Sequence, residues 1–567
     1  MPVVARRPAG SYAGGVTSAP DRTSAPTTSA WAPRTRAWLD LLVGWPSVTG
    51  SLDEQAFAPR LHTALAEHPY FQAHPDHLWR QPALGGGPEN LLALVRGEGP
   101  ETVILSGHYD TVSVDPYGSL APLAHQPEAL RAALLEELQP LSPNTSERLA
   151  WDDLAGGDFL PGRGVLDMKG GIAAGLSVLE HWLEAPGRRG NLLLAFSPDE
   201  EDRSRGARAA RHALGEAARR WGLTFAAGVN LDATSDLGDG TQGRSIALGT
   251  VGKLLPFVFM LGRGTHAGYP FEGLSAHAMS AELLRRLEIN PEFADSAHGE
   301  AAPPPACLEL RDLRGGYDVT TPDRVWSAYN VLTHRRTPAE VLDLFCAEVG
   351  DSMETVIHEQ ACRAAALGLK PTDSPPRVLT FGALRQLVLE AGGPDVQAAY
   401  EVLVQQHAQA TNPLDASREV TDWLTRQAGL RGPVAVVGFA GLHYPHTHVT
   451  GHGPAGERLR QVALDVAAST QPPLSVRQFF AGISDMSFLG APPDRDRQRD
   501  VQANTAVPAF VDAGEDASLP FPVFPTVNVG PWGREYHQRL ERVHLPYALE
   551  TLPEVVWRLV TGLLPQP

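Results

Sequence analysis

The stretch Gly164-Val-Leu-Asp-Met-Lys-Gly-Gly171 decides the fold of this chain, and Asp167 lies at its centre. Glycines and a proline just before it are typical of a loop, and the apolar residues from Ile172 to Leu183 recur at helical spacing. We therefore expect a buried helix that begins at the glycine pair and follows Asp167 directly. A lone acidic residue at such a position is most often a helix cap, so the role of Asp167 depends on the rest of the chain.

Apolar runs of strand length precede most of the other candidate side chains, and helical segments separate these runs. The runs are Thr102–Ser106 before His108, Asn191–Phe196 before Glu200 and Glu201, and Ala226–Leu231 before Asp232. This alternation predicts an α/β fold with a mostly parallel sheet. Ligands bind beyond the carboxyl ends of the strands in such sheets, which is where these side chains would lie.

Composition excludes several classes of protein. The 567 residues are too many for one ordinary core, so we expect at least two domains. A formal net charge of −18 argues against nucleic acid as a partner, because nucleic acid requires a basic surface. The sequence holds no apolar run long enough to span a membrane, and its three cysteines form no CxxC pair. Together these features predict a cytoplasmic protein without a membrane partner.

Changes in pattern along the chain suggest four segments. Residues 1–33 are rich in Gly, Ser, Thr, Ala and Pro and are expected to be a disordered leader. Residues 34–245 are expected to form the first part of the main domain and to include a long insertion at 113–160. Residues 246–365 are predicted to form a smaller β-α-β-β-α block inserted into that domain. Residues 366–567 are expected to complete the domain that begins at residue 34.

The candidate side chains have the chemistry of a metal site. Histidine nitrogens and carboxylate oxygens suit zinc and related divalent ions, and a rigid sheet can hold them in place. In an extended strand Asp110 points the same way as His108 and can orient its imidazole. Because Glu200 and Glu201 are adjacent, one can bind metal while the other stays free as a base.

Six short segments follow one another in the order found in a known enzyme family. They are Ser106-Gly-His-Tyr-Asp-Thr-Val112, Asp167-Met-Lys-Gly-Gly171, Asp199-Glu-Glu201, Gly262-Arg-Gly-Thr-His-Ala-Gly268, Gly482-Ile-Ser-Asp-Met-Ser487 and Gly530-Pro-Trp-Gly-Arg-Glu-Tyr-His537. Together they resemble the M20 family of dinuclear metallopeptidases and deacylases over nearly the whole chain beyond residue 34. The insertion after Asp110 and the Glu541-Arg-Val543 that follows His537 most resemble the arginine-utilisation branch.

The resemblance implies a zinc-peptidase-like, mostly parallel-sheet catalytic domain with an inserted α+β lid of ferredoxin-like topology. It implies two divalent ions, for which we expect zinc, with manganese or cobalt as alternatives. The implied metal ligands are His108, Asp167 as the bridge, Glu201, Asp232 and His537. The implied catalytic residues are Glu200 as general base, Asp110 as the partner of His108, and His266 as the lid histidine that polarises the scissile carbonyl, often across a dimer interface.

The substrate is less well defined than the metal site. Where related enzymes carry an Asp-x-Arg strand in the lid, this chain has Asn330-Val-Leu332, so recognition of a substrate carboxylate stays open. We expect Asn330 and the histidine cluster around His446 on the substrate side of the pocket. The favoured function is hydrolysis of a peptide or an N-acyl amino acid, with a link to arginine catabolism by resemblance. The alternatives are a catalytically silent binding protein and a dimeric scaffold.

Overall fold

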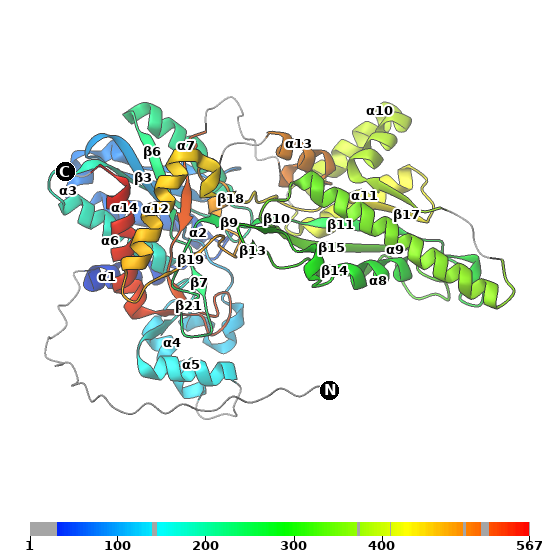
Figure 1. Cartoon of the computed structure of the whole chain (residues 1–567), viewed down its shortest axis with the longest axis horizontal. Coiled ribbons are helices and arrows are strands. Elements are labelled where there is room, and N and C mark those ends of the chain that lie inside the picture. Colours follow the sequence, from blue (N-terminus) through cyan, green and yellow to red (C-terminus); the bar gives the residue numbers. More distant parts are fainter. Residues whose placement is uncertain are drawn as a thin grey trace, which may run out of the picture.

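The computed structural model describes residues 31–138, 145–370, 375–408, 410–491, 495–511 and 521–565. These residues form two domains that lie side by side, each around its own sheet (Figure 1). The predicted leader falls outside the described residues except for positions 31–33, which belong to helix α1 (Trp31–Val43). These positions belong to the folded part of the chain because Trp31 is buried and its indole nitrogen donates a hydrogen bond to Glu554.

The first domain contains an eight-stranded sheet in the order β1-β2-β5-β3-β6-β20-β8-β19. Its central strands β5, β3, β6 and β20 run parallel, and β1 and β2 add antiparallel pairs at one edge. The sheet consists of β1 (Leu78–Pro82), β2 (Glu89–Val95), β3 (Glu98–His108), β5 (Arg189–Ser197), β6 (Thr224–Asn230), β8 (Ser245–Ala247), β19 (Ser475–Arg477) and β20 (Thr526–Asn528). This architecture confirms the predicted α/β class.

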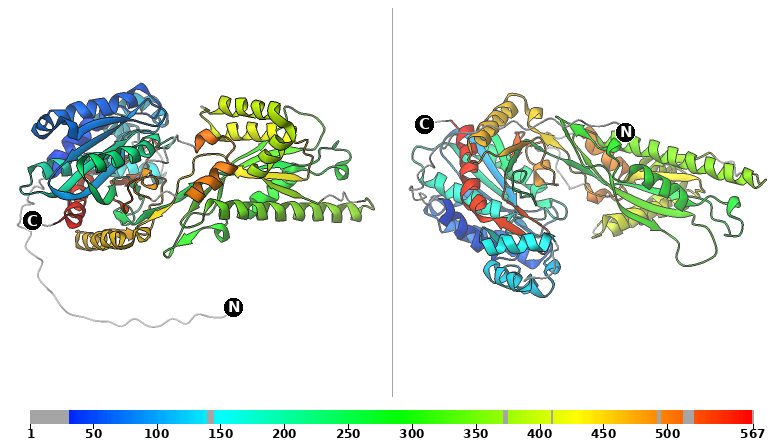
Figure 2. Two further views of the ribbon diagram at one scale, coloured as in Figure 1. Left: turned by 90° about the horizontal axis from the view of Figure 1, so that it is seen from above. Right: turned by 60° about the horizontal axis from the view of Figure 1, so that its bottom comes forward.

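Helices cover both faces of this sheet (Figure 2). On one face Leu91 and Val95 pack into the large core that includes α6, α12 and α14, whereas on the other Leu92 and Leu94 pack against α7. A strand buried on both faces needs a continuous apolar run, which is the pattern seen in the sequence. The helices of this domain are α1, α2 (Leu52–Ala66), α3 (Pro69–Ala73), α6 (Lys169–Glu184), α7 (Arg205–Trp221), α12 (Gly453–Ser469) and α14 (Leu552–Leu563).

The insertion after Asp110 folds onto the C-terminal part of the chain. It carries α4 (Pro127–Glu137), α5 (Thr145–Gly156) and β4 (Phe159–Pro161). Strand β4 pairs with β22 in a small sheet of order β4-β22-β21-β7. The other strands of that sheet are β7 (Thr234–Ser235), β21 (Trp532–Arg534) and β22 (Arg542–His544). The insertion thus supports the segment that carries His537.

The second domain is built on a six-stranded sheet of order β10-β15-β11-β17-β16, with β14 also paired to β15. On one face Val258 and Met260 pack with α8 and α9, and on the other Phe257 and Phe259 pack with α10 and α11. The strands are β10 (Gly252–Leu254), β11 (Pro256–Leu261), β14 (Ala306–Asp312), β15 (Arg324–Thr333), β16 (Arg377–Thr380) and β17 (Val434–Phe439). The helices are α8 (Ala276–Leu287), α9 (Pro338–Ala366), α10 (Phe381–His407) and α11 (Pro413–Gln427).

The second domain extends beyond the boundary at 365 that the sequence suggested. Strand β17 pairs with β11 along its whole length, and β16 pairs with β17, so residues up to Phe439 belong to this sheet. The chain returns to the second domain at α13 (Arg495–Asn504), which packs against α9 and α10 (Figure 1). The difference arises because the apolar run of β17 shows that the strand is buried on both faces, but not which sheet it joins.

Short strands connect the two domains. They form the pairs β12 (Ser296–Ala297) with β13 (Glu300–Ala301), and β9 (Gly249–Thr250) with β18 (Thr447–His448). Glu300 of the second domain accepts hydrogen bonds from the backbone nitrogens of Gln478 and Phe479, which follow β19 of the first domain. Across the described ranges, no helix combines the length and apolarity that a bilayer crossing requires.

Candidate active site

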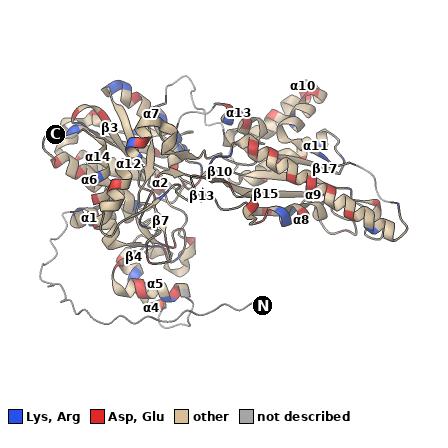
Figure 3. Ribbon diagram, viewed as in Figure 1, with Lys and Arg blue, Asp and Glu red and all other residues tan. Residues whose placement is uncertain are grey.

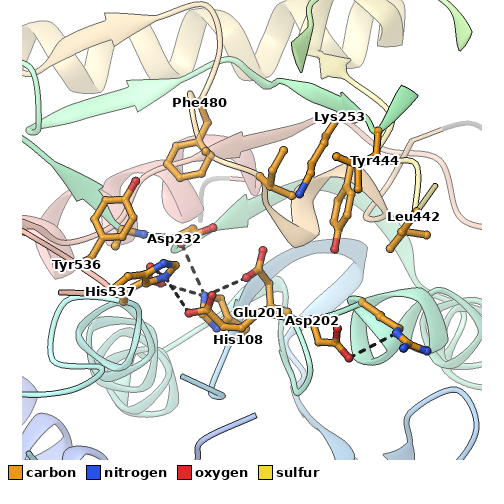
Figure 4. A pocket seen from close by; sticks show the side chains of 18 of the residues that line it. His108, Glu201, Asp202, Asp232, Lys253, Leu442, Tyr444, Phe480, Tyr536 and His537 are labelled. Atoms are coloured by element: carbon orange, nitrogen blue, oxygen red, sulfur yellow. Dashed lines mark hydrogen bonds and ion pairs between the residues drawn. The ribbon is translucent and has the colours of Figure 1, made fainter. Parts of the chain in front are cut away.

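The predicted metal ligands converge at one edge of the first sheet. His108 is the last residue of β3, Glu201 follows β5, Asp232 follows β6, and Asp167 lies two residues before α6. His537 comes from the loop after β21, so five segments supply the set (Figure 4). All five residues line a cavity of about 400 Å³ between the two domains.

Asp167 occupies the centre of this cluster. Its Oδ1 lies 3.1 Å from His108 Nε2, and its Oδ2 lies 3.1 Å from His537 Nε2. Asp232 Oδ1 lies 3.9 Å from the same His108 nitrogen, and Glu201 Oε1 lies 3.0 Å from the same His537 nitrogen. Each oxygen of Asp167 therefore faces its own histidine and second carboxylate, which is the geometry a bridging carboxylate needs.

His537 reaches the cluster from a strained backbone. Its φ is 64°, a left-handed conformation that non-glycine residues adopt at a cost. Strain of this kind persists when surrounding contacts hold it, and it concentrates at functional sites. The side chain of His537 remains 41% exposed, whereas that of Asp167 is 11% exposed, so His537 forms the open rim of the cluster.

Asp110 holds the cluster in place through hydrogen bonds. The Nδ1 of His108 lies 3.1 Å from the Asp110 carbonyl oxygen and 3.6 Å from its carboxylate. The same carboxylate accepts hydrogen bonds from the backbone nitrogens of Glu200 and Glu201, at 3.1 and 3.2 Å, and from the hydroxyl of Thr49 at 2.9 Å. One buried acid therefore orients both the histidine at the end of β3 and the acidic pair after β5.

Burial of several carboxylates together shifts their pKa values. Burial, reinforced by neighbouring acids, raises the pKa of Glu200 well above its ordinary range. Burial and the charge of Asp167 raise the pKa of Asp232 to about 7. Burial also acts on Asp167, but its contacts with His108 and His537 outweigh that effect and lower its pKa. Asp167 is thus the acid of this group that stays ionised most readily.

The residues present fit divalent cations. Among the described residues, Asp167, Glu200, Glu201 and Asp232 form ion pairs with histidines and with no lysine or arginine. Buried acids without cationic side chains are costly unless bound cations compensate their charge. One ligand atom from each of His108, Asp167 and Glu201 lies within 4.8 Å of the others. Imidazole and carboxylate ligands of this kind suit zinc, manganese or cobalt.

Glu541 supports the loop that carries Asp167, a role that the sequence did not reveal. Its buried Oε1 accepts hydrogen bonds from the backbone nitrogens of Gly164, Leu166 and Asp167, at 2.9, 3.4 and 3.5 Å. Its Oε2 pairs with Arg163, which follows β4. Burial raises the pKa of Glu541 to about 7, although Arg163 opposes the shift. The insertion thereby contributes to the position of Asp167 without lining the cavity.

His266 lies away from the cavity of its own chain. It follows the outer end of β11, whose inner end adjoins β10 at the junction of the domains. The side chain is exposed, and its Nδ1 accepts a hydrogen bond from the backbone nitrogen of Gly268 at 3.0 Å. Within one chain, the structure therefore does not bring His266 to the cluster around Asp167.

Asn330 and His446 also lie outside the cavity lining, in contrast to the predicted substrate contact. Asn330 sits within β15, opposite Ala306 of the edge strand β14. His446 turns toward the second domain, where its ring nitrogens lie 3.4 Å from Thr333 Oγ1 and 3.3 Å from Arg497 Nη1. These contacts place both residues in the packing of the second domain rather than at the pocket.

Comparison with known proteins gives the family. The family model described as peptidase family M20/M25/M40 matches residues 139–495. The chain belongs to this family. As an M20 protein it is a metal-dependent hydrolase, and the resemblance seen in the motifs is confirmed.

Similar proteins cover nearly the whole chain. The uncharacterised protein YqjN of Bacillus subtilis (strain 168) is 31% identical over 542 residues, which are 94% of this chain and 96% of YqjN. Protein RocB of the same organism is 27% identical over 563 residues, covering 94% and 95% of the two chains. A crystal structure of a tripeptidase from Staphylococcus aureus subsp. aureus Mu50 has a TM-score of 0.51 at 15% identity, covering 94% and 98%. This last likeness shows the shared fold.

Proposed function

We propose that this chain binds two divalent metal ions across Asp167 and hydrolyses the amide bond of a peptide or an N-acyl amino acid. The observation that carries the proposal is the position of Asp167, whose two oxygens each face a different histidine. His108 and Asp232 would hold one ion, and Glu201 and His537 the other. We propose zinc, and manganese or cobalt as metals that the same ligands accept.

Glu200 is the proposed general base. Bound divalent ions supply a polarised carbonyl and a water of lowered pKa. Glu200 lines the cavity, and its carboxylate lies 3.9 Å from His108 Nε2. In the proposed reaction Glu200 accepts a proton from the attacking water and later delivers it to the leaving nitrogen. The backbone nitrogen of Glu200 donates a hydrogen bond to the Asp110 carboxylate, which holds the backbone while the side chain moves the proton.

The proposed role of His266 requires a second copy of the chain. His266 is exposed and does not line its own cavity. We propose a homodimer formed through the second domain, in which the lid histidine of one copy serves the cavity of the other. There it would donate a hydrogen bond to the carbonyl oxygen as negative charge develops.

The proposed substrate class and setting follow from the family. M20 membership supports a peptide or an N-acyl amino acid as the substrate. A link to arginine or other amino-acid catabolism is proposed from the motifs shared with the arginine-utilisation branch and from the similarity to protein RocB. We propose a cytoplasmic location because Cys307, Cys346 and Cys362 are all free, as is usual in a reducing compartment.

A hydrolysis screen tests the proposal. The purified full chain is stripped of metal, reloaded with zinc, manganese or cobalt, and assayed on dipeptides and N-acetyl amino acids. We expect turnover that depends on added metal and that Glu200→Gln reduces by about 10²- to 10⁴-fold. Glu216→Gln, a change of an exposed residue of helix α7 that does not line the cavity, is the matched control and should leave turnover unaltered. Metal-independent turnover, or equal turnover in both variants, would overturn the proposal.

A further inference from the structure

Lys253 stands on the cavity wall opposite the acidic cluster. It belongs to β10 and lines the cavity with Tyr444 and Phe480, and Figure 4 shows its nitrogen directed into the cavity. Its backbone is fixed on both sides. The nitrogen of Lys253 donates to the Tyr444 carbonyl at 2.8 Å, the Tyr444 nitrogen donates to the Lys253 carbonyl at 3.0 Å, and Leu332 of β15 pairs with Lys253 across the sheet.

The Lys253 ammonium lacks a partner in the described part of the chain. It makes no ion pair or hydrogen bond with any described residue, although it is half-buried in the cavity wall, and the Glu200 carboxylate interacts with its charge from beyond ion-pair distance. Among the described lining residues, Arg203 is the other one with a Lys or Arg side chain. It already forms an ion pair with Asp202 at 3.5 Å and donates a hydrogen bond to the Ala410 carbonyl at 2.6 Å. A half-buried ammonium without a partner is costly, and an anionic ligand would remove that cost.

Apolar side chains line part of the same cavity. Leu255, Leu442, Phe480 and Phe510 contribute to its lining. The acids and histidines around Asp167 form one end, and Lys253 lies on the wall contributed by the second domain. A ligand that spans this space would place an uncharged reacting group at the acidic end and a negative group at Lys253.

We propose that Lys253 binds a carboxylate of the substrate and so selects acids over their uncharged analogues. The inference rests on the proposed amide hydrolysis and names the substrate more closely, as an amide that carries a free carboxylate. That carboxylate can belong to the amino-acid part or to the acyl part, and both present the same group to the ammonium. Lys253 is then a specificity-determining residue, because it holds the substrate without touching the bond that breaks.

Matched substrate pairs test this inference. N-acetyl amino acids are compared with their carboxamides, and N-succinyl amino-acid amides with the N-acetyl amides, so the two pairs distinguish the two sources of the carboxylate. Lys253→Met should lower kcat/KM for the preferred acid about 10- to 100-fold more than it lowers kcat/KM for the uncharged analogue. Most of this loss should come from a higher KM for the acid. Lys253→Arg keeps the charge and should restore most of the discrimination. Lys370→Met removes an exposed lysine and controls for net charge.

A binding measurement decides the inference even without turnover. The chain has only three lysines, Lys169, Lys253 and Lys370, so reductive methylation with carbon-13 formaldehyde gives few lysine signals and retains their charge. The Lys253 signal, assigned by its loss in Lys253→Arg, should shift on titration with an N-acetyl amino acid or N-succinyl amide and not with the uncharged analogue. An inactive wild type with this shift would refute the proposed function alone. No shift, or equal losses for acids and uncharged analogues in Lys253→Met, would overturn the role of Lys253.

Discussion

Both domains carry acidic and basic residues on their helices (Figure 3), but the acids at the strand ends of the first domain differ in their partners from the acids of the second domain. In the second domain, acids pair with arginines near the surface, as Arg324 does with Asp422 at 2.7 Å and Arg286 with Glu348 at 3.1 Å. In the first domain, the acids at the strand ends are buried and, among the described residues, have only histidines within ion-pair distance. Surface pairs contribute little to stability, whereas a buried acidic cluster is costly unless cations join it.

This difference in partners identifies the acids whose burial is not explained by the folding of the chain alone. The arginine pairs of the second domain are complete within the chain. The cluster around Asp167 has more carboxylates than the chain provides cations for, and Glu200 and Asp232 respond with raised pKa values. Such a mismatch in a cavity is typical of a site built for a ligand.

The largest effect is expected at Glu200. Glu200→Gln removes a proton acceptor of nearly the same size, so kcat should fall by about 10²- to 10⁴-fold while bound metal is retained. Turnover and metal content of the same sample measure the two quantities. A variant that loses metal in parallel with activity would reassign Glu200 from base to ligand.

The next effect concerns His266 and the proposed dimer. His266→Ala should lower kcat by about 10²- to 10³-fold if the histidine stabilises the developing charge on the carbonyl oxygen. Mixing and reassembling His266→Ala with Glu200→Gln chains should restore activity, because mixed dimers contain one cavity with both residues intact. If the mixture stays as inactive as its components, the two residues do not act on a shared site across an interface.

A smaller effect is expected at Glu541, which supports Asp167 without lining the cavity. Glu541→Gln keeps the shape but weakens the hydrogen bonds to the loop of Asp167 and the pair with Arg163. Metal affinity should fall about 10- to 100-fold, as is typical when a supporting partner of a ligand is changed. Competition with a chelator measures the affinity. Unchanged affinity together with a lower thermal midpoint would show that Glu541 serves stability alone.

The smallest effect is expected in the second domain. Asp422→Asn breaks the pair with Arg324, in which both side chains are partly exposed. The free energy of unfolding should change by at most about 1 kcal/mol, and kcat should stay the same. Urea unfolding and the activity assay provide the comparison. A large loss of activity would mean that the outer part of the second domain is coupled to the cavity.

The sequence predicted the sheet of the first domain better than the second domain. Long apolar runs predicted β3, β5 and β6 close to their observed positions, because strands of a parallel sheet are buried on both faces. The similar run of β17 lies within residues 366–567, which were expected to complete the first domain, but it pairs with β11 of the second domain. An apolar run predicts that a strand is buried. It does not predict which strand lies beside it, because that depends on contacts with residues far away in the sequence.

The convergence of the proposed metal ligands was also predictable, since these residues follow strand ends or lie in motifs. His108 and His537 are more than four hundred residues apart in the sequence, yet both lie 3.1 Å from oxygens of Asp167. Lys253 and Glu541 could not be assigned roles in this way. Lys253 is a single charge in an apolar segment, and the hydrogen bonds of Glu541 depend on how the insertion folds back onto the C-terminal strands.

The most direct test of the central claim is the location of metal in crystals of the zinc-loaded chain, by anomalous scattering. We expect two peaks on either side of Asp167, one near His108 and Asp232 and the other near His537 and Glu201. A single peak, or peaks that do not contact Asp167, would contradict the proposed two-metal centre.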